Sequence, residues 1–374
     1  MLDRRAFLGT LGAAPIAAPA AFARTDGYAD ADYARAIVID GLAGLNDPGG
    51  DENSLVFSAR GAAEQRQSGV TAMQQTIGEV GNVADAWTKA LASIGAMDRW
   101  IYANPALFLR ARLAADIRRA KAEGRCAIIY GTQDTAMIGA NLERVDVLAG
   151  LGVRVVQLTY NLRNLSGDGA LEPDNAGLSR LGRATIEKIE DARLLLDLSH
   201  GGARTIAEAV AAAKRPLTIS HTGCRALNDN PRNVADSALR AVAEKGGVVG
   251  IYWMPFLVAN SKPTAADLIR HIDHAVNVCG EDHVGIGTDG ALSALVIDAA
   301  ARAQQRKFFE DRQKQGVAAP GEGADIFNYV SDLNSHMRFR ILADRLSGAG
   351  WPGRRIDKLL GANLLRLYAD AWGG

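Results

Sequence analysis

The sequence predicts a single (β/α)8 barrel, an α/β fold in which parallel strands alternate with helices. Eight short, apolar, β-rich runs recur along the chain, and helix-like stretches with apolar residues at i, i+3 and i+4 lie between most of them. This alternation implies a parallel sheet with right-handed crossovers, and eight units over roughly 250 residues fit the size of a barrel. Two of the runs end in a histidine, His200 and His221, where barrels carry their chemistry.

The predicted strands are apolar runs bounded by Gly, Pro or polar residues, which is typical of buried parallel strands. They are residues 36–40, 69–76, 126–130, 153–160, 194–200, 216–221, 247–253 and 283–289. The predicted helices between them are residues 106–123, 142–151, 178–192, 205–213 and 237–244. A doubly wound open sheet is the alternative, but no G-x-G-x-x-G turn follows the first strand, so that fold would lack its phosphate loop.

The barrel domain is predicted to span residues 30–374. Residues 300–323 read as a charged helix followed by a Gly- and Pro-rich loop, which indicates an insertion after the last strand. Residues 333–374 are expected to form closing helices, with residues 361–368 packed on the outside of the barrel. The apolar exterior could be covered by these helices alone or partly by a second subunit, so a homodimer stays open.

The composition is that of an ordinary globular protein. The chain has 374 residues, 48% of them hydrophobic, and its 42 basic and 42 acidic residues give a formal net charge of zero. A balanced charge offers no electrostatic footprint for nucleic acid or for an anionic membrane surface. The composition therefore predicts no nucleic-acid partner.

The N-terminal 23 residues resemble an export signal. Arg4 and Arg5 precede an Ala-rich apolar stretch, and residues 21–23 form an A-x-A end. The paired arginines are typical of a twin-arginine signal, which predicts a mature protein in the periplasm or outside the cell. The apolar stretch is too short to span a bilayer, so no membrane span is expected in the mature chain.

Two histidines from successive strands could share one metal ion. His200 and His221 are separated by 21 residues (221 − 200), which is one helical crossover, so both can point into the same cavity. Barrel hydrolases hold metals with strand-end His, Asp and Glu side chains. Asp289, at the end of the last strand, could complete such a site or could simply cap a helix. The alternative for each histidine is a satisfied strand-end residue without a metal.

Five motifs of this chain resemble those of the renal (membrane) dipeptidase family, peptidase family M19. They are residues 197–200 (DLSH), 220–222 (SHT), 231–234 (PRNV), 285–290 (GIGTDG) and 361–366 (GANLLR). The resemblance runs in order from about residue 36 to the end of the chain. It implies a barrel of the metal-dependent hydrolase type that cleaves dipeptides at a binuclear zinc site. It also implies that His200 and His221 are zinc ligands, that Arg232 grips the substrate carboxylate, and that Asp289 handles protons.

The chain departs from the family pattern at several metal ligands. The family's first strand ends Asp-Gly-His-x-Asp, whereas this chain has Leu42 and Gly44 at the two ligand positions. The family's bridging glutamate falls at Gln133, and its strand-four histidine falls at Tyr160. These departures predict about one zinc per chain, held by His200 and His221 with Gln133 or Asp289 as a further contact.

The sequence therefore predicts a periplasmic dipeptidase-like metallohydrolase that cleaves an amide bond in a small substrate bearing a carboxylate. Asp289 would shuttle the proton, Arg232 would bind the carboxylate, and Tyr160 would contact the substrate and donate a hydrogen bond to the developing oxyanion. The alternative is a metal-poor barrel that has lost hydrolysis and serves for binding or for other chemistry, because barrels host many functions.

Overall fold

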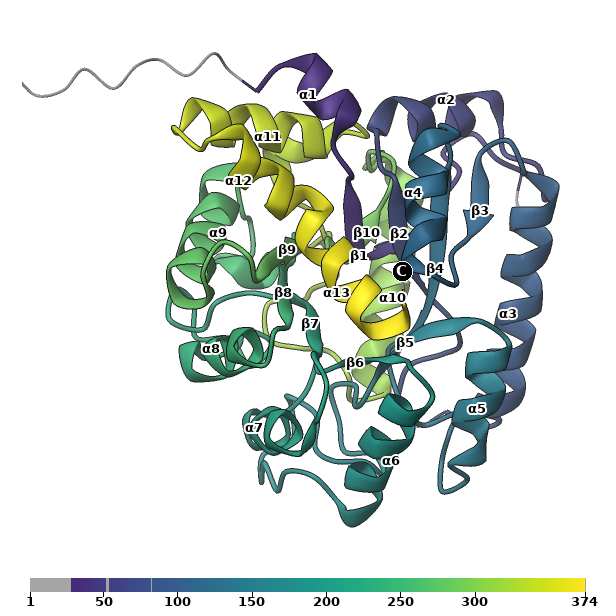
Figure 1. Ribbon diagram of the computed structural model, residues 1–374, viewed down its shortest axis with the longest axis vertical. Helices are drawn as coiled ribbons and strands as arrows, with labels where there is room; N and C mark the ends of the chain where they lie inside the picture. The colour runs from purple at the N-terminus through teal and green to yellow at the C-terminus, as the bar shows by residue number, and fades with distance from the viewer. Residues whose placement is uncertain (1–27, 52–53, 82, 374) are drawn as a thin grey trace, which may run out of the picture.

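Eight parallel strands form the ring of the barrel (Figure 1). The computed structural model describes residues 28–51, 54–81 and 83–373, so the predicted export signal lies outside the described residues. The ring strands are β1 (Ile39–Gly44), β2 (Ala72–Thr76), β4 (Cys126–Thr132), β5 (Val153–Gln157), β6 (Leu195–Asp197), β7 (Thr218–Thr222), β8 (Val248–Ile251) and β9 (Val284–Ile286). Each pairs in parallel with the next.

A two-residue strand joins the last strand to the first. β10 (Gly290–Ala291) follows β9 after three residues and pairs in parallel with β1, where Ala43 lies opposite Gly290. The main-chain amide of Asp289 also donates to the carbonyl of Leu42 at 2.8 Å. The predicted (β/α)8 barrel is thus confirmed, and the open sheet is excluded.

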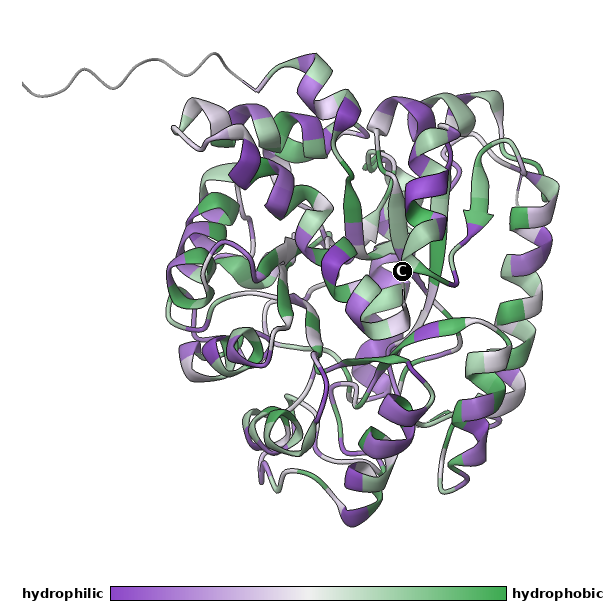
Figure 2. Cartoon of the chain, viewed as in Figure 1, coloured by the Kyte–Doolittle hydropathy of each residue, from purple (hydrophilic) through white to green (hydrophobic). Residues whose placement is uncertain are grey.

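The described residues form thirteen α-helices, and most of them surround the ring as the apolar periodicity predicts. They are α1 (Asp30–Arg35), α2 (Ala59–Ser68), α3 (Ala86–Ala103), α4 (Ala114–Ala122), α5 (Glu143–Gly150), α6 (Arg180–Asp191), α7 (Ala203–Ala212), α8 (Asp236–Glu244), α9 (Ala265–Cys279), α10 (Ala299–Lys314), α11 (Arg338–Gly348), α12 (Gly353–Asp357) and α13 (Asn363–Trp372). In Figure 2 these helices carry both hydrophilic and hydrophobic residues, whereas the strands are largely hydrophobic.

The predicted helix over residues 106–123 is wrong at its start. Residues Phe108–Arg110 form a short strand, β3, which pairs in parallel with the first residues of β4, and the helix begins only at Ala114. Phe108 and Leu109 are both buried in this extended segment. A short apolar run that is buried on both faces can be a strand or part of a buried helix, and periodicity alone cannot separate the two.

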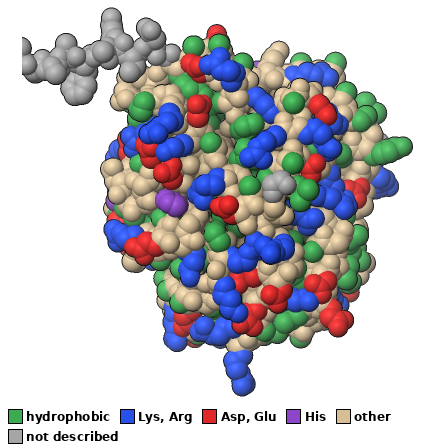
Figure 3. Space-filling view, in the orientation of Figure 1, with side chains coloured by type: hydrophobic (Ala, Val, Ile, Leu, Met, Phe, Trp, Pro, Cys, Tyr) green, Lys and Arg blue, Asp and Glu red, His purple; other side chains and the backbone are tan. Residues whose placement is uncertain are grey.

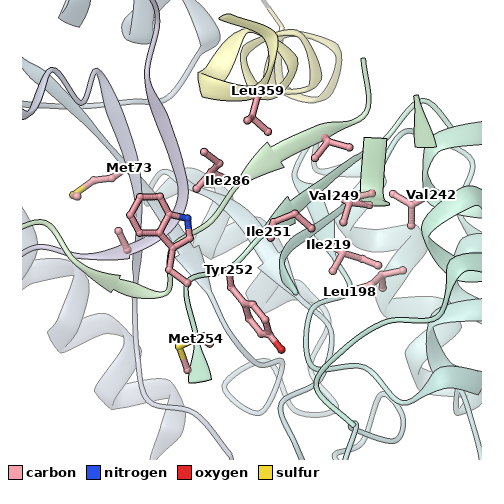
Figure 4. Close-up of a cluster of buried hydrophobic side chains, with 14 of the residues drawn as sticks. Met73, Leu198, Ile219, Val242, Val249, Ile251, Tyr252, Met254, Ile286 and Leu359 are labelled. Atoms are coloured by element: carbon pink, nitrogen blue, oxygen red, sulfur yellow. The ribbon is translucent and has the colours of Figure 1, made fainter. Parts of the chain in front are cut away.

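Most of the core lies between the ring and the surrounding helices. Figure 4 shows part of it, where Ile219, Val249 and Ile251 from neighbouring strands meet Leu198 and Val242. A second cluster fills the inside of the barrel, and its members from the strands include Ile39, Ile129, Val155, Leu195 and Val248.

The sequence predicted that the last helix packs on the outside of the barrel. In the structure this helix closes one end of the barrel instead. Leu364, Leu367 and Tyr368 of α13 belong to the cluster inside the barrel, and α13 lies in front of the strands in the middle of Figure 1. Gly361 permits this course, since a Cβ at that position would come within 2.4 Å of the carbonyl oxygen of Ile37. The apolar face of α13 therefore has a buried partner that sequence periodicity could not identify.

The surface visible in Figure 3 carries basic and acidic side chains interspersed, with no extended field of one sign. Within the described part of the chain, no helix is both long enough and apolar enough to cross a membrane.

Candidate active site

His200 and His221 lie side by side at the carboxyl ends of β6 and β7. Their ring centroids are 4.9 Å apart, with the planes inclined by 64°, and both side chains are buried. His221 lies within β7. The predicted strand over 194–200 ends earlier, at Asp197, so His200 occupies the turn before α7 with a left-handed φ of 63°. A non-glycine residue held in this region is strained, and such strain clusters at functional sites.

Hydrogen bonds fix the tautomer of His221. The hydroxyl of Ser220 donates to the carboxylate of Asp197 at 2.5 Å, so its oxygen accepts from His221 Nδ1 at 2.8 Å. Asp197 also accepts from the hydroxyl of Ser199. His221 Nδ1 therefore carries the proton, and Nε2 presents a lone pair.

His200 is oriented by Asn161. Its Nδ1 lies 2.6 Å from Asn161 Oδ1, and the amide nitrogen of Asn161 donates to the carbonyl of Val317 at 2.7 Å. Because Asn161 must point its nitrogen at that carbonyl, its oxygen is left to accept from His200 Nδ1–H. The Nε2 atoms of both histidines are buried and have no hydrogen-bond partner among the described residues.

Burial keeps both imidazoles neutral. Desolvation is the main cause that lowers the pKa of His200 and His221 well below the ordinary value, and the charge of Arg232 lowers both further. Neutral imidazoles with free Nε2 atoms are the form in which histidine binds a metal.

Tyr160 covers His200. The two rings stack with centroids 4.1 Å apart and planes inclined by 23°. The tyrosine hydroxyl accepts a hydrogen bond from Arg312 at 3.0 Å, and burial raises the pKa of Tyr160. The hydroxyl therefore keeps its own proton and can donate it to an oxygen atom in the pocket.

The predicted insertion covers this part of the site. After α10 the chain returns as a loop over residues 315–323, and Asn230 donates to the carbonyl of Pro320 at 2.6 Å. Arg312 of α10 forms two hydrogen bonds with Glu322, of 2.5 and 2.7 Å, and a third with the carbonyl of Val317. The side chains of Arg312 and Glu322 are only 12% and 8% exposed, so this ion pair is largely shielded from water.

Arg232 offers a free guanidinium beside the histidines. The residue is 3% exposed, and its main chain is fixed by a hydrogen bond from its amide to Asn230 and by one from Thr222 to its carbonyl. Its guanidinium has no hydrogen bond or ion pair with the described residues. Burial lowers the pKa of Arg232, and the oxygens of Tyr252, Tyr160 and Asp289 counteract this effect. A buried, unpaired guanidinium is suited to a carboxylate ligand.

Asp289 lies in the segment that joins β9 to β10. It has a left-handed φ of 54°, and its carboxylate accepts no hydrogen bond from the described residues. Burial raises its pKa to about 6, although Arg232 and Arg312 oppose the shift. Asp40 on β1 anchors this segment, because it accepts from both the amide and the hydroxyl of Thr288 at 2.7 Å.

Gln133 and Asp289 line one cavity of about 400 Å³ at the ends of β1, β2 and β4, and the histidines are not among its lining residues. Leu42 and Gly44, the positions that lack the family's ligands, also line it. Gln133 donates from Nε2 to the hydroxyl of Thr76 at 2.8 Å. The structure therefore places Gln133 with Asp289, and its contact with a metal stays a prediction.

The two histidines fit part of a metal site. Their orphaned, buried Nε2 atoms are suitable donors for Zn²⁺. In residues 28–51, 54–81 and 83–373, however, no group of three or more His, Cys, Asp or Glu side chains is placed to hold a metal ion. The donor set thus fits one ion whose remaining positions are filled from outside the protein.

Sequence reasoning missed the residues that orient this site. Asn161 follows Tyr160 directly, but nothing in its local sequence shows that it will bridge to the insertion. Arg312 and Glu322 belong to a charged helix and a Gly- and Pro-rich loop, which read as surface features. Ser220 and Asp197 are inside the quoted motifs, so their position next to the histidines was the only available signal.

Comparison with known proteins places this architecture in a family. The model of the membrane dipeptidase family, peptidase family M19, matches residues 56–298, well over half of the chain. A solved amidohydrolase from Pseudomonas aeruginosa is 30% identical with a TM-score of 0.78, and the alignment covers 92% of this chain and 99% of that one.

Two curated relatives are similar over shorter segments. A protein of Klebsiella pneumoniae, described as an uncharacterized protein in the pqqA 5' region, is 26% identical over 69% of this chain and 87% of its own length. Dipeptidase tcpJ of Claviceps purpurea is 30% identical over 48% of this chain and 43% of its own length. The matched segment therefore spans less than half of that dipeptidase. With the barrel, the paired histidines and the family match together, this chain belongs to the membrane dipeptidase family of hydrolases.

Proposed function

We propose that this protein is a dipeptidase-like hydrolase that cleaves an amide bond in a small, carboxylate-bearing substrate with a single zinc ion held by His200 and His221. One observation carries the proposal. Two neutral imidazoles with orphaned Nε2 atoms lie next to a buried guanidinium, Arg232, that has no partner of its own among the described residues. Buried polar groups without partners are costly, so their coexistence supports a ligand at this place.

Three side chains near the histidines would each have a different role in the reaction. Arg232 would bind the substrate carboxylate with two parallel hydrogen bonds and so fix the substrate's position. Asp289, whose pKa is about 6, is ionised at neutral pH and would accept a proton from the attacking water. Tyr160 would donate its hydroxyl proton in a hydrogen bond to the oxygen that develops negative charge at the scissile carbonyl.

A zinc ion bound to His200 and His221 would supply Lewis acidity at this position. The hydrogen bonds from Asn161 and Ser220 hold the histidines in the tautomer that presents Nε2, as outer-shell partners of metal ligands do. The lid formed by residues 315–323 and the Arg312–Glu322 pair would exclude bulk water from the charges below it.

The place where the protein works is a separate proposal, which rests on the N-terminal sequence alone. We propose that the mature chain acts in the periplasm or outside the cell, on the strength of the paired arginines and the A-x-A sequence in residues 1–23.

Elemental analysis of the purified protein beside a dipeptide hydrolysis assay tests the proposal. About one zinc per chain is expected, together with hydrolysis, and both should be lost in His200→Ala and in His221→Ala. His283→Ala is a matched control, because His283 lies outside the site and bonds to the carbonyl of Gly247. Full zinc and full activity in either site variant would contradict the assignment, and a metal-free protein without hydrolysis would favour a binding role.

A further inference from the structure

The cavity at the ends of β1, β2 and β4 has an unusual lining. It measures about 400 Å³, large enough for the side chain of a substrate. Five carboxamide side chains line it: Asn46, Gln75, Gln133, Gln305 and Asn328. Asp289 is the one charged side chain in the lining, and no Lys, Arg or His contributes to it.

Several of these amides have hydrogen-bonding capacity to spare. Gln305 uses Nε2 for the carbonyls of Gly323 and Ile326, so its Oε1 is left as an acceptor. Gln133 likewise uses Nε2 for Thr76, and its Oε1 is left without a partner. The amide of Asn328 makes no hydrogen bond with the described residues. The wall therefore presents both acceptors and donors to whatever fills the cavity.

The charge balance of the cavity disfavours ions. A carboxylate in this cavity would lose its hydration and face Asp289 without a cation in the lining, which is costly. A cation would find only Asp289, whose charge is already opposed by Arg232 and Arg312. An apolar group would leave the free amide atoms of Gln133, Gln305 and Asn328 without a partner, which is also unfavourable.

We propose that this cavity is a substrate subsite for an uncharged, hydrogen-bonding group, such as a carboxamide-bearing side chain. That the bound molecule is a substrate rests on the proposed function. Recognition of its uncharged group can be measured as binding alone. Asp289 lines the cavity, and its pKa is lowered by the charge of Arg232. A group in the cavity would therefore belong to the same bound molecule as the carboxylate that Arg232 binds.

Three dipeptides of similar size separate the alternatives: glutaminyl-alanine, glutamyl-alanine and leucyl-alanine. The dissociation constant by calorimetry and kcat/KM should both favour glutaminyl-alanine by about 10-fold over the other two, the scale of one or two net hydrogen bonds. Equal or tighter binding of leucyl- or glutamyl-alanine by the native protein would overturn the proposal.

Two variants locate the preference in the cavity. Asn328→Leu removes an amide that has no bond within the protein, so it should abolish the glutaminyl preference without unfolding the chain. Gln305→Leu should have the same effect, with Gln304→Leu, an exposed neighbour on α10, as the matched control. A preference that survives in both variants would also overturn the proposal.

The binding measurement keeps this proposal separate from the proposed function. Preferential binding of glutaminyl-alanine without any hydrolysis would support the subsite and contradict the hydrolytic role. Hydrolysis of all three dipeptides at equal kcat/KM, with equal dissociation constants, would support the hydrolytic role and contradict the subsite.

Discussion

The side chains of His200 and Asn161 share a hydrogen bond of 2.6 Å, and Asn161 is itself held by the main-chain carbonyl of Val317. The insertion after the last strand therefore sets the tautomer of a histidine that follows β6. Covering the site and preparing its chemistry are two effects of the same loop.

Replacing Asn161 by Ala should weaken zinc binding by about 10- to 100-fold, the usual effect of removing an outer-shell partner of a metal-binding histidine. His200 would lose the acceptor that fixes its tautomer, while Nε2 itself would remain. Competition with a chelator of known affinity measures the loss, and Asn260→Ala, at an exposed position, is the control. Unchanged zinc affinity would show that Tyr160 stacking alone orients His200.

Arg232→Lys should raise KM by about 10- to 150-fold, which corresponds to about 1.5–3 kcal/mol for hydrogen bonds to a charged group. Lysine keeps the charge but cannot form two parallel hydrogen bonds with a carboxylate. Steady-state kinetics on the best dipeptide measure the change, with the exposed Arg306→Lys as control. If KM were unchanged, Arg232 would not contact the substrate carboxylate.

Asp289 should impose a fall of kcat/KM below about pH 6, because a general base works only when it is ionised and the pKa of Asp289 is about 6. The same shift affects stability. Between about pH 4 and pH 6 the unfolded chain loses this proton while the folded chain keeps it, so the free energy of unfolding falls as the pH rises through that window.

Asp289→Asn should therefore raise the melting temperature near pH 8 but leave it nearly unchanged near pH 3.5, while activity is lost. The stabilisation at the higher pH should be on the order of 2–3 kcal/mol, from the shift of the pKa from 3.8 to about 6. Thermal denaturation at the two pH values measures it. Equal effects at both would mean that the ionisation of Asp289 does not affect folding.

The triple variant Leu42→His, Gly44→Asp and Gln133→Glu should bind a second divalent ion, because it restores the ligand set that the family resemblance implies. The backbone leaves room at Gly44, where a Cβ would meet only the carbonyl of Gly290 at 3.9 Å. The metal content per chain, measured by elemental analysis, and the rate of dipeptide hydrolysis should both exceed those of the native protein. Two tightly bound metals in the native protein would instead show that these positions are not needed.

The sequence predicted the barrel well because its strands repeat a local pattern. His221 was located correctly at a strand end, whereas His200 was placed within a strand that in fact ends at Asp197. The left-handed φ of His200 depends on contacts made by Asn161 and the insertion, which no local pattern records. Likewise, the amphipathic pattern of α13 showed an apolar face but not its partner, so a helix expected outside closes the end of the barrel.

The motifs predicted that His200, His221, Arg232 and Asp289 belong to one site. They did not predict the electrostatic environment of these side chains. Arg312 affects Tyr160, His200 and Asp289, yet it lies in a charged helix whose sequence suggests only solvent exposure. Its burial follows from the return of the chain over the barrel mouth. That path depends on tertiary contacts, notably the bonds that Asn161 and Asn230 donate to the loop.

Those two bonds end on the carbonyls of Val317 and Pro320, so at these two points the barrel holds the loop by its backbone, whatever the side chains are. Substitutions at the exposed positions of this loop, such as Gln315 and Pro320, can accumulate without releasing it, whereas the buried Val317 and Ala319 and the paired Glu322 are constrained. The loop can thus diversify in sequence among descendants of this protein while the histidine beneath it keeps its orientation. Saturation libraries aimed at new substrates would be best placed there.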